Sequence, residues 1–179
     1  ASSRRLLQIE QSQRQAPRVD FKPIAAWNAM SGDALCMGYR IMNDQRYLDS
    51  ALNIGEKLLA SCRPLVPRIL GQDHLGTLED QSWTLWFWLS LYSCTGDEKW
   101  LNAVCTLFPQ VLDAFGSEEF GLQLQHPSAG LPISLQCADD YSEHSPVGIM
   151  MEVLVVLENL GVPQLKQSTI ENLWPKLIV

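Results

Sequence analysis

The sequence is short of charge, above all of positive charge. Only 18% of its 179 residues are Asp, Glu, Lys or Arg, against about 25% in an average soluble domain. Acidic residues outnumber basic ones, so the formal net charge is -7. Phosphate binding needs clustered Lys and Arg, and no basic stripe extends beyond the adjacent Arg4 and Arg5. We therefore expect no nucleic-acid partner.

Long apolar runs are also missing. The most apolar run, from Trp83 to Tyr92, has about half of the roughly 20 residues that a membrane helix needs. The first residues, ASSRRLLQIEQSQRQAP, contain no apolar core of a signal peptide. We expect no membrane span, and a protein that is intracellular, either soluble or part of a complex, in the cytoplasm or in an organelle.

Paired cysteines are absent as well. The five cysteines form no CxxC pair, and their number is odd. A metal site requires ligands at paired spacing, and a secreted disulfide framework usually has an even count. The sequence also has no phosphate loop and no dinucleotide fingerprint. We expect reduced, mostly buried thiols, no metal and no cofactor.

Helical periodicity runs through most of the chain. One helix carries an apolar stripe of Trp27, Met30, Ala34, Cys36/Met37 and Ile41, at intervals of about three and four residues. We expect residues 1–23 to be an N-terminal extension and residues 24–179 to form one helical domain. A long connection from Gly116 to His144 is expected to contain a short hairpin at 120–124. The predicted helices span 24–42, 46–62, 78–94, 98–115, 146–160 and about 163–174.

An internal repeat organises these helices. The stretch Asn43-Asp44-Gln45-Arg46-Tyr47-Leu48 resembles Gly96-Asp97-Glu98-Lys99-Trp100-Leu101, and a weaker copy begins at Gly161. Each copy has a turn, and the two stronger copies continue with an aromatic residue and Leu as the next helix begins. The repeating unit is a two-helix hairpin, which must stack on neighbours to bury its apolar faces. The sequence therefore predicts an all-α fold, an arc of about three αα-hairpins.

Half of the six tryptophans lie in the segment LEDQSWTLWFWLSLYSC, which begins at Leu78. This segment is the first helix of the middle hairpin, so its tryptophans are expected to pack between helix layers. The alternative is that one or two rings, such as Trp83, reach a cavity and stack on a sugar or another flat ligand. Both interpretations are kept open at this stage.

Several stretches stand in a fixed order along the chain: 14–22 (RQAPRVDFK), 26–29 (AWNA), LEDQS, TGDEKWL and the helix start at Pro146. Together they resemble the C-terminal region of the thioredoxin-domain proteins typified by spermatogenesis-associated protein 20. The resemblance implies half of an (α/α)6 toroid, similar to the toroids of N-acylglucosamine 2-epimerases and six-hairpin glycosidases. It also implies a partner, either another protein chain or the missing half of the ring.

Sugar chemistry of that kind needs two acid or base groups that face one cavity. The candidate catalytic residues are Glu79, Asp80 and His144, which lie at expected helix starts. The structural alternative is that the acids cap their helices, with Thr77 and Asp80 as a shortened capping box. The candidate ligand-binding residues are Trp27, Asn28, His74, Trp83 and Asp140.

Three functions follow as hypotheses. The favoured one is a non-catalytic or degenerate half-toroid that acts as an interaction scaffold, because Val147 and Ile149 stand where the family has polar residues. The second is a carbohydrate epimerase, isomerase or glycosidase, which predicts two catalytic groups about 5 to 10 Å apart across an open cavity. The third is an accessory module of a thiol-redox protein. A scaffold predicts instead that the acids cap helices and that an apolar face is free.

Overall fold

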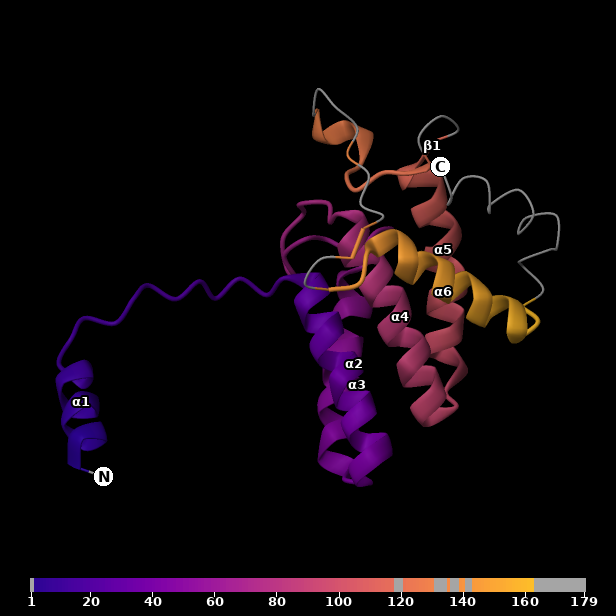
Figure 1. Ribbon diagram of the computed structural model, residues 1–179. Helices are drawn as coiled ribbons and strands as arrows, with labels where there is room; N and C mark the ends of the chain where they lie inside the picture. The colour runs from indigo at the N-terminus through magenta and orange to yellow at the C-terminus, as the bar shows by residue number, and fades with distance from the viewer. Residues whose placement is uncertain (1, 118–120, 131–134, 136–138, 141–142, 163–179) are drawn as a thin grey trace.

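The computed structural model describes residues 2–117, 121–130, 135, 139–140 and 143–162. These residues contain six α-helices, one short 3-10 helix and a pair of two-residue strands. Figure 1 shows the helices α2 to α6 gathered in one body, with α1 (Ser2–Ser12) at the end of a drawn-out segment. The all-α class predicted from the sequence is confirmed.

The first hairpin consists of α2 (Ala25–Met42) and α3 (Gln45–Ser61). Asn43 ends α2 in the left-handed conformation, with φ of 52°. Asp44 then caps α3, because its carboxylate accepts a hydrogen bond from the Arg46 N–H at 3.0 Å. A left-handed residue followed by an Asp cap reverses the chain within two residues.

The second hairpin repeats this turn. It consists of α4 (Leu78–Thr95) and α5 (Glu98–Phe115), joined by Gly96 with φ of 66° and by Asp97. The Asp97 carboxylate accepts the Lys99 N–H at 3.0 Å. The two stronger copies of the sequence repeat therefore form the same turn, a left-handed residue followed by an Asp cap.

The third unit begins with α6 (Pro146–Asn159), which starts at a proline and ends near Gly161, whose φ is 64°. The second helix expected for this unit, from 163 to about 174, lies outside the described residues. The arc of three hairpins and its half-ring closure stay predictions.

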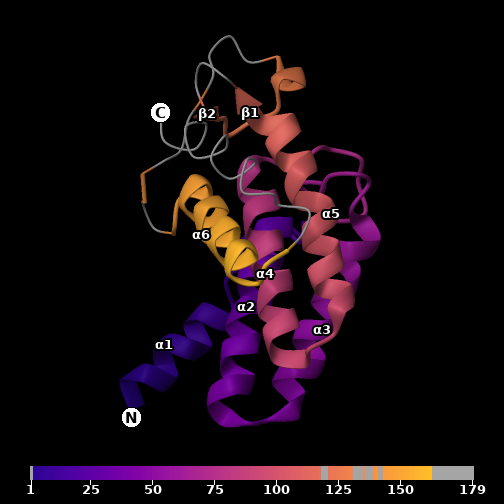
Figure 2. The same cartoon turned by 90° about the vertical axis from the view of Figure 1, so that its right-hand side faces the viewer.

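Helix α4 lies at the centre and packs against α2, α3, α5 and α6 (Figure 2). A helix that is apolar on all sides is expected to be buried, and α4 buries twelve of its eighteen residues. Trp88 is 1% exposed and Trp83 9% exposed, whereas Trp86 is half-buried. The expectation that tryptophans of this segment pack between helix layers is confirmed for Trp83 and Trp88.

Two glycines let the other helices approach this centre. A Cβ added to Gly32 on α2 would lie 2.3 Å from the ring of Phe87 on α4. A Cβ added to Gly55 on α3 would lie 2.5 Å from Leu91 and 2.8 Å from the ring of Trp100. The helix layers are in contact through these positions, so each admits no larger residue without a shift of its neighbours.

The segments outside the helical body differ from the sequence expectations in detail. Within the extension, α1 is a helix that was not anticipated, and its Leu6, Leu7 and Ile9 are exposed. The expected short hairpin is present but begins earlier, since β1 (Gly116–Ser117) pairs antiparallel with β2 (Gly121–Leu122). A 3-10 turn, η1 (Pro127–Ala129), follows.

None of the described helices combines the length and the apolar character needed to cross a membrane.

Candidate functional site

Asp80, a candidate catalytic residue, is wholly buried at the start of α4. Its carboxylate accepts hydrogen bonds from the backbone N–H of Ala26 at 3.0 Å, the backbone N–H of Thr77 at 2.8 Å and the Thr77 hydroxyl at 3.1 Å. The capping box predicted for Thr77 and Asp80 is therefore present. Its carboxylate also reaches the first turn of α2, which lies 54 residues earlier in the chain.

Arg68 joins Asp80 to Glu79. Its Nη1 donates to both Asp80 oxygens at 3.1 Å and to the Glu79 carboxylate at 2.8 Å. Partial burial lowers the pKa of Arg68, but the hydrogen bonds and charges of Glu79 and Asp80 outweigh it and hold the pKa above its ordinary value. The positive charge of the guanidinium thus offsets the free-energy cost of burying the negative charge of the Asp80 carboxylate.

Gln81 completes this cluster. Its side-chain amide donates to the Val66 C=O at 2.7 Å, and its side-chain oxygen accepts the Val66 N–H at 2.9 Å. Arg68, Glu79, Asp80 and Gln81 are hereafter called the α4 node. The node ties α4, the start of α2 and the loop before α4 into one unit.

His74 lines a cavity of about 300 Å3 beside the α4 node. Its walls carry hydrogen-bonding groups, because Thr77, Gln125, His126 and Ser128 also line it. The Nδ1 of His126 accepts the Ser128 N–H at 3.1 Å and lies 2.7 Å from the Ser128 hydroxyl, which fixes the ring in the turn. Among the candidate site residues, His74 is the one that this cavity includes.

The remaining candidates are distributed over the fold. The Asn28 side chain donates to the Ile24 C=O at 2.8 Å, so it closes its own helix turn. The Asp140 carboxylate accepts the Ser145 N–H at 2.7 Å, just before α6. His144 is exposed. The described contacts bring Glu79 and Asp80 together, but none of them joins His144 or Asp140 to that pair.

Trp27 belongs to an exposed apolar face of α2. Helix α2 buries several small residues, among them Ala25, Ala29, Gly32 and Cys36, and exposes four large apolar ones. We call these four the α2 stripe; they are Trp27 (60% exposed), Met37 (51%), Ile41 (72%) and Met42 (65%). An apolar stripe on a helix is expected to face the core. Of the stripe predicted for this helix, Cys36 is buried and Met30 half-buried, but Trp27, Ala34, Met37 and Ile41 are exposed.

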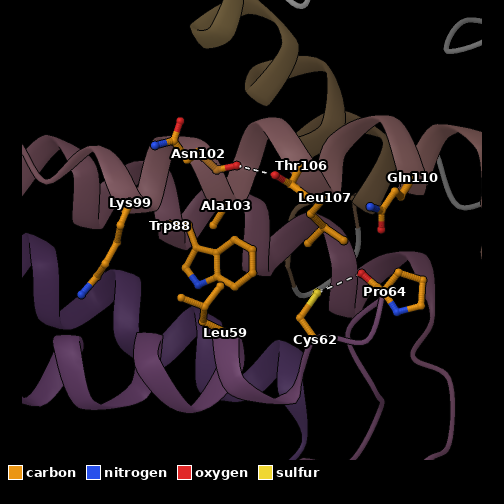
Figure 3. Close-up of a pocket in the computed structure, with 10 residues that line it drawn as sticks. All are labelled: Leu59, Cys62, Pro64, Trp88, Lys99, Asn102, Ala103, Thr106, Leu107 and Gln110. Atoms are coloured by element: carbon orange, nitrogen blue, oxygen red, sulfur yellow. Dashed lines mark hydrogen bonds between the residues drawn. The ribbon is translucent and has the colours of Figure 1, made fainter.

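A groove between α3 and α5 was not anticipated from the sequence. It encloses about 360 Å3 and lies over Leu59, Trp88 and Leu107 (Figure 3). Asn102, Thr106 and Gln110 line it along α5 at intervals of four residues. In the sequence, the sign of this groove wall is that three neutral polar residues recur on one face of the helix.

The thiols are poorly suited to nucleophilic chemistry. The four described cysteines are free. Burial raises the pKa of Cys36 to about 12, aided by the nearby Cys94, and burial raises the pKa of Cys62 to about 11. The thiolate is the reactive form, so little of either group reacts near neutral pH. In the part of the chain that the structure describes, no three His, Cys, Asp or Glu residues are placed to hold a metal ion.

Comparison with known proteins adds no family to these observations. No protein-family model matches the sequence, and no curated protein matches it either.

Proposed function

We propose that this chain is a helical-hairpin module that acts as a scaffold by docking on another helical hairpin. The observation that carries the proposal is the α2 stripe, which presents four large apolar side chains to solvent. In keeping with the sequence resemblance, the partner hairpin comes from another chain or from the missing half of a toroid.

The α4 node supports this function over catalysis. An acid or base catalyst has to meet a substrate across an open cavity. The Asp80 carboxylate instead meets two backbone N–H groups, a hydroxyl and a guanidinium. Contacts of this kind stabilise a fold and hold two helix starts at a fixed distance.

The chemistry of the α2 stripe indicates the kind of partner. Its side chains are neutral and flexible or aromatic, and they follow one helix face opposite the buried small residues. Burying such a face is favourable, and the apolar face of a second helix is the surface that fits it best. A contiguous apolar face of this kind marks an interaction site more often than free surface.

The first test is the mass of the native species, by size exclusion with light scattering on protein from its source. The proposal expects a particle well above the 20.1 kDa of one chain. Hydroxyl-radical footprinting of that particle should show Met37 and Met42 protected compared with the isolated chain. A monodisperse particle of one chain with these methionines fully reactive would contradict the proposal.

A variant pair makes the test specific. Replacing Met37 and Ile41 by Asp adds two charges to the α2 stripe and should shift the particle to the mass of one chain. Replacing Asn53 and Ala60 by Asp adds the same charges at exposed positions of α3 and should leave the mass unchanged. Circular dichroism should show equal helix content in both variants, because all four positions are exposed.

One observation favours carbohydrate binding as a second candidate function. The His74 cavity carries imidazole, hydroxyl and carboxamide groups, and such hydrogen-bonding groups suit hydroxyl-rich ligands. The test is a thermal-shift screen of monosaccharides and disaccharides against the chain and its His74→Ala variant. A sugar that raises the unfolding temperature of the chain but not of the variant would support it, and no shift with any sugar would remove it.

A further inference from the structure

Helix α2 carries apolar residues at the spacing of a coiled-coil seam. Trp27, Met30, Ala34, Met37 and Ile41 follow one another at alternating intervals of three and four residues. We call these five residues the α2 seam. This alternation keeps one line of residues facing a partner helix that crosses at about 20°. The seam is open to solvent, because Met30 is half-buried and the other four residues are exposed.

The α2 seam contains no charged residue. The two charged residues of α2 are Asp33 and Arg40. Each directly precedes a seam residue and lies about 100° round the helix from it, and the Asp33 carboxylate accepts a hydrogen bond from the Ser90 hydroxyl of α4. The formal net charge of -7 makes two copies of the chain repel each other. At the neutral seam, two copies meet without placing like charges in contact.

The seam has the same spacing in both directions. From Met30, the steps to Ala34, Met37 and Ile41 are four, three and four residues, and the reversed order gives four, three and four again. An antiparallel copy of α2 therefore aligns Met30 with Ile41 and Ala34 with Met37, and each pair occurs twice about a two-fold axis. A two-fold interface requires a self-complementary patch of this kind.

Side-chain size favours the antiparallel pairing over the parallel one. The antiparallel pairing sets the small Ala34 against the long and adaptable Met37 in both central layers. A parallel copy would set Ala34 against Ala34, and the void between them would cost packing contacts. At each end of the antiparallel pair, Trp27 of one copy reaches the last turn of α2 in the other. That turn holds Met42, which is 65% exposed in the single chain.

We propose that the partner hairpin is the α2–α3 hairpin of a second copy of this chain, with the two α2 helices packed antiparallel along the α2 seam. Met30 lies opposite Ile41, and Ala34 lies opposite Met37. Figure 1 shows α2 and α3 on one side of α4 and α5 on the other, so α5 stays outside this contact. The inference rests on the proposed scaffold function, because it names the occupant of the α2 stripe.

Disulfide crosslinking tests the pairing on the full chain. Met30→Cys and Ile41→Cys chains are oxidised separately and after mixing, and linked peptides are identified by mass spectrometry. The 30–41 link should form only in the mixture. In the antiparallel pair, position 30 is eleven residues from position 30 of the copy, about 16.5 Å at 1.5 Å per residue, which exceeds the roughly 7 Å between Cα atoms that a disulfide spans. The unsubstituted chain, oxidised in parallel, shows which links its own cysteines form.

The possible results separate this inference from the scaffold function. A particle of two chains with the 30–41 link and with Met37 and Met42 protected supports both. Links between like positions, 30–30 or 41–41, would overturn the antiparallel pairing. A particle that contains another protein, with both methionines protected and no 30–41 link, would overturn the second copy as partner and leave the scaffold function in place. A particle of one chain with both methionines reactive would overturn both.

A matched pair of variants measures the contribution of the centre of the seam. Ala34→Arg places a bulky charge opposite Met37 and should raise the dissociation constant of the two-chain particle at least about tenfold, as for a central interface residue. Ala60→Arg makes the same change at an exposed position of α3 and should leave the dissociation constant unchanged. Circular dichroism should show equal helix content in both variants. Equal dissociation constants for the two variants would contradict the proposal.

Discussion

Asp80 shows how one residue at an expected helix start serves several segments at once. The capping contact with Thr77 is local and was predicted from the sequence. The contacts with Ala26 and Arg68 join segments that are distant along the chain. The same carboxylate thus accepts hydrogen bonds from backbone N–H groups at the starts of both α4 and α2, where the helices themselves offer no acceptor.

Replacing Asp80 by Asn is expected to destabilise the fold strongly. The Asn amide brings donors to a place where Ala26, Thr77 and Arg68 already donate, and Arg68 loses half of its ionic partners. Removing one partner of a buried ion pair costs roughly 3 kcal/mol or more, and urea denaturation measures the loss. Asp73→Asn, at an exposed carboxylate in the preceding loop, should change the unfolding free energy by less than about 0.5 kcal/mol. Equal stability of both variants would show that Asp80 has no structural role.

The buried thiols predict a loss of stability at alkaline pH. The pKa values of Cys36 and Cys62 are about 12 and about 11 in the folded chain, above the ordinary 9.0. The folded state therefore holds these protons more tightly, and the stabilisation is complete below pH 9 and is lost as the pH rises towards 11 and 12. Urea midpoints of the chain and of a Cys36→Ala, Cys62→Ala variant, measured from pH 8 to pH 11, should decline more steeply for the unsubstituted chain. Parallel declines would contradict the assignment.

At the scale of elements, contact between helices depends on which residues are small. Helix α2 places Gly32 against Phe87 of α4, whereas Gly38 on the same helix has its closest neighbour, the Tyr47 ring, at 3.4 Å from an added Cβ. Both glycines lie inside one helix, so an Ala at either position gains about the same helix propensity. The packing around each site then decides the outcome.

Gly32→Ala is expected to lower the unfolding free energy, while Gly38→Ala is not. An added methyl at position 32 meets the buried Phe87 ring at 2.3 Å, and overpacking of this kind costs about 1–3 kcal/mol. At position 38 the contact is ordinary, so the gain in helix propensity of up to about 1 kcal/mol should remain. Denaturant unfolding of the two variants measures the difference. A stabilised Gly32→Ala variant would show that α2 and α4 are less closely packed than described.

At the scale of the whole molecule, the chain divides into a helical body and a segment with few contacts to it. The hydrogen bond from the Leu70 N–H to the Pro23 C=O at 3.0 Å marks the boundary. The sequence analysis placed the end of the N-terminal extension at residue 23. Residues before this point are exposed throughout the range from Ser3 to Pro23.

Removal of residues 1–22 should leave the stability of the body nearly unchanged. The side chains of this part are exposed, and their removal exposes no core residue. At protein concentrations low enough for single chains, the unfolding free energy should change by less than about 0.5 kcal/mol, as for surface changes in general. A loss of several kcal/mol in urea denaturation would show that the extension packs on the body of its own chain.

The sequence determined the helix boundaries of the described helical body closely, although it did not indicate α1. Proline, glycine and Asp positions placed the five helices from α2 to α6 within about one residue of their observed ends. The repeated turn at Asn43 and Gly96 was predictable because its hydrogen bonds span two to four residues. The same holds for the capping contact of Thr77 and Asp80.

Only the tertiary structure decided which surfaces those helices bury. Periodicity identified an apolar stripe on α2, but it could not show that the side with Ala25, Ala29 and Gly32 would be buried while most of the stripe stays exposed. That choice follows from close packing against Phe87, a residue 55 positions away. The pairing of Arg68 with Asp80 and the groove beside Trp88 likewise depend on distances between segments, which no local pattern contains.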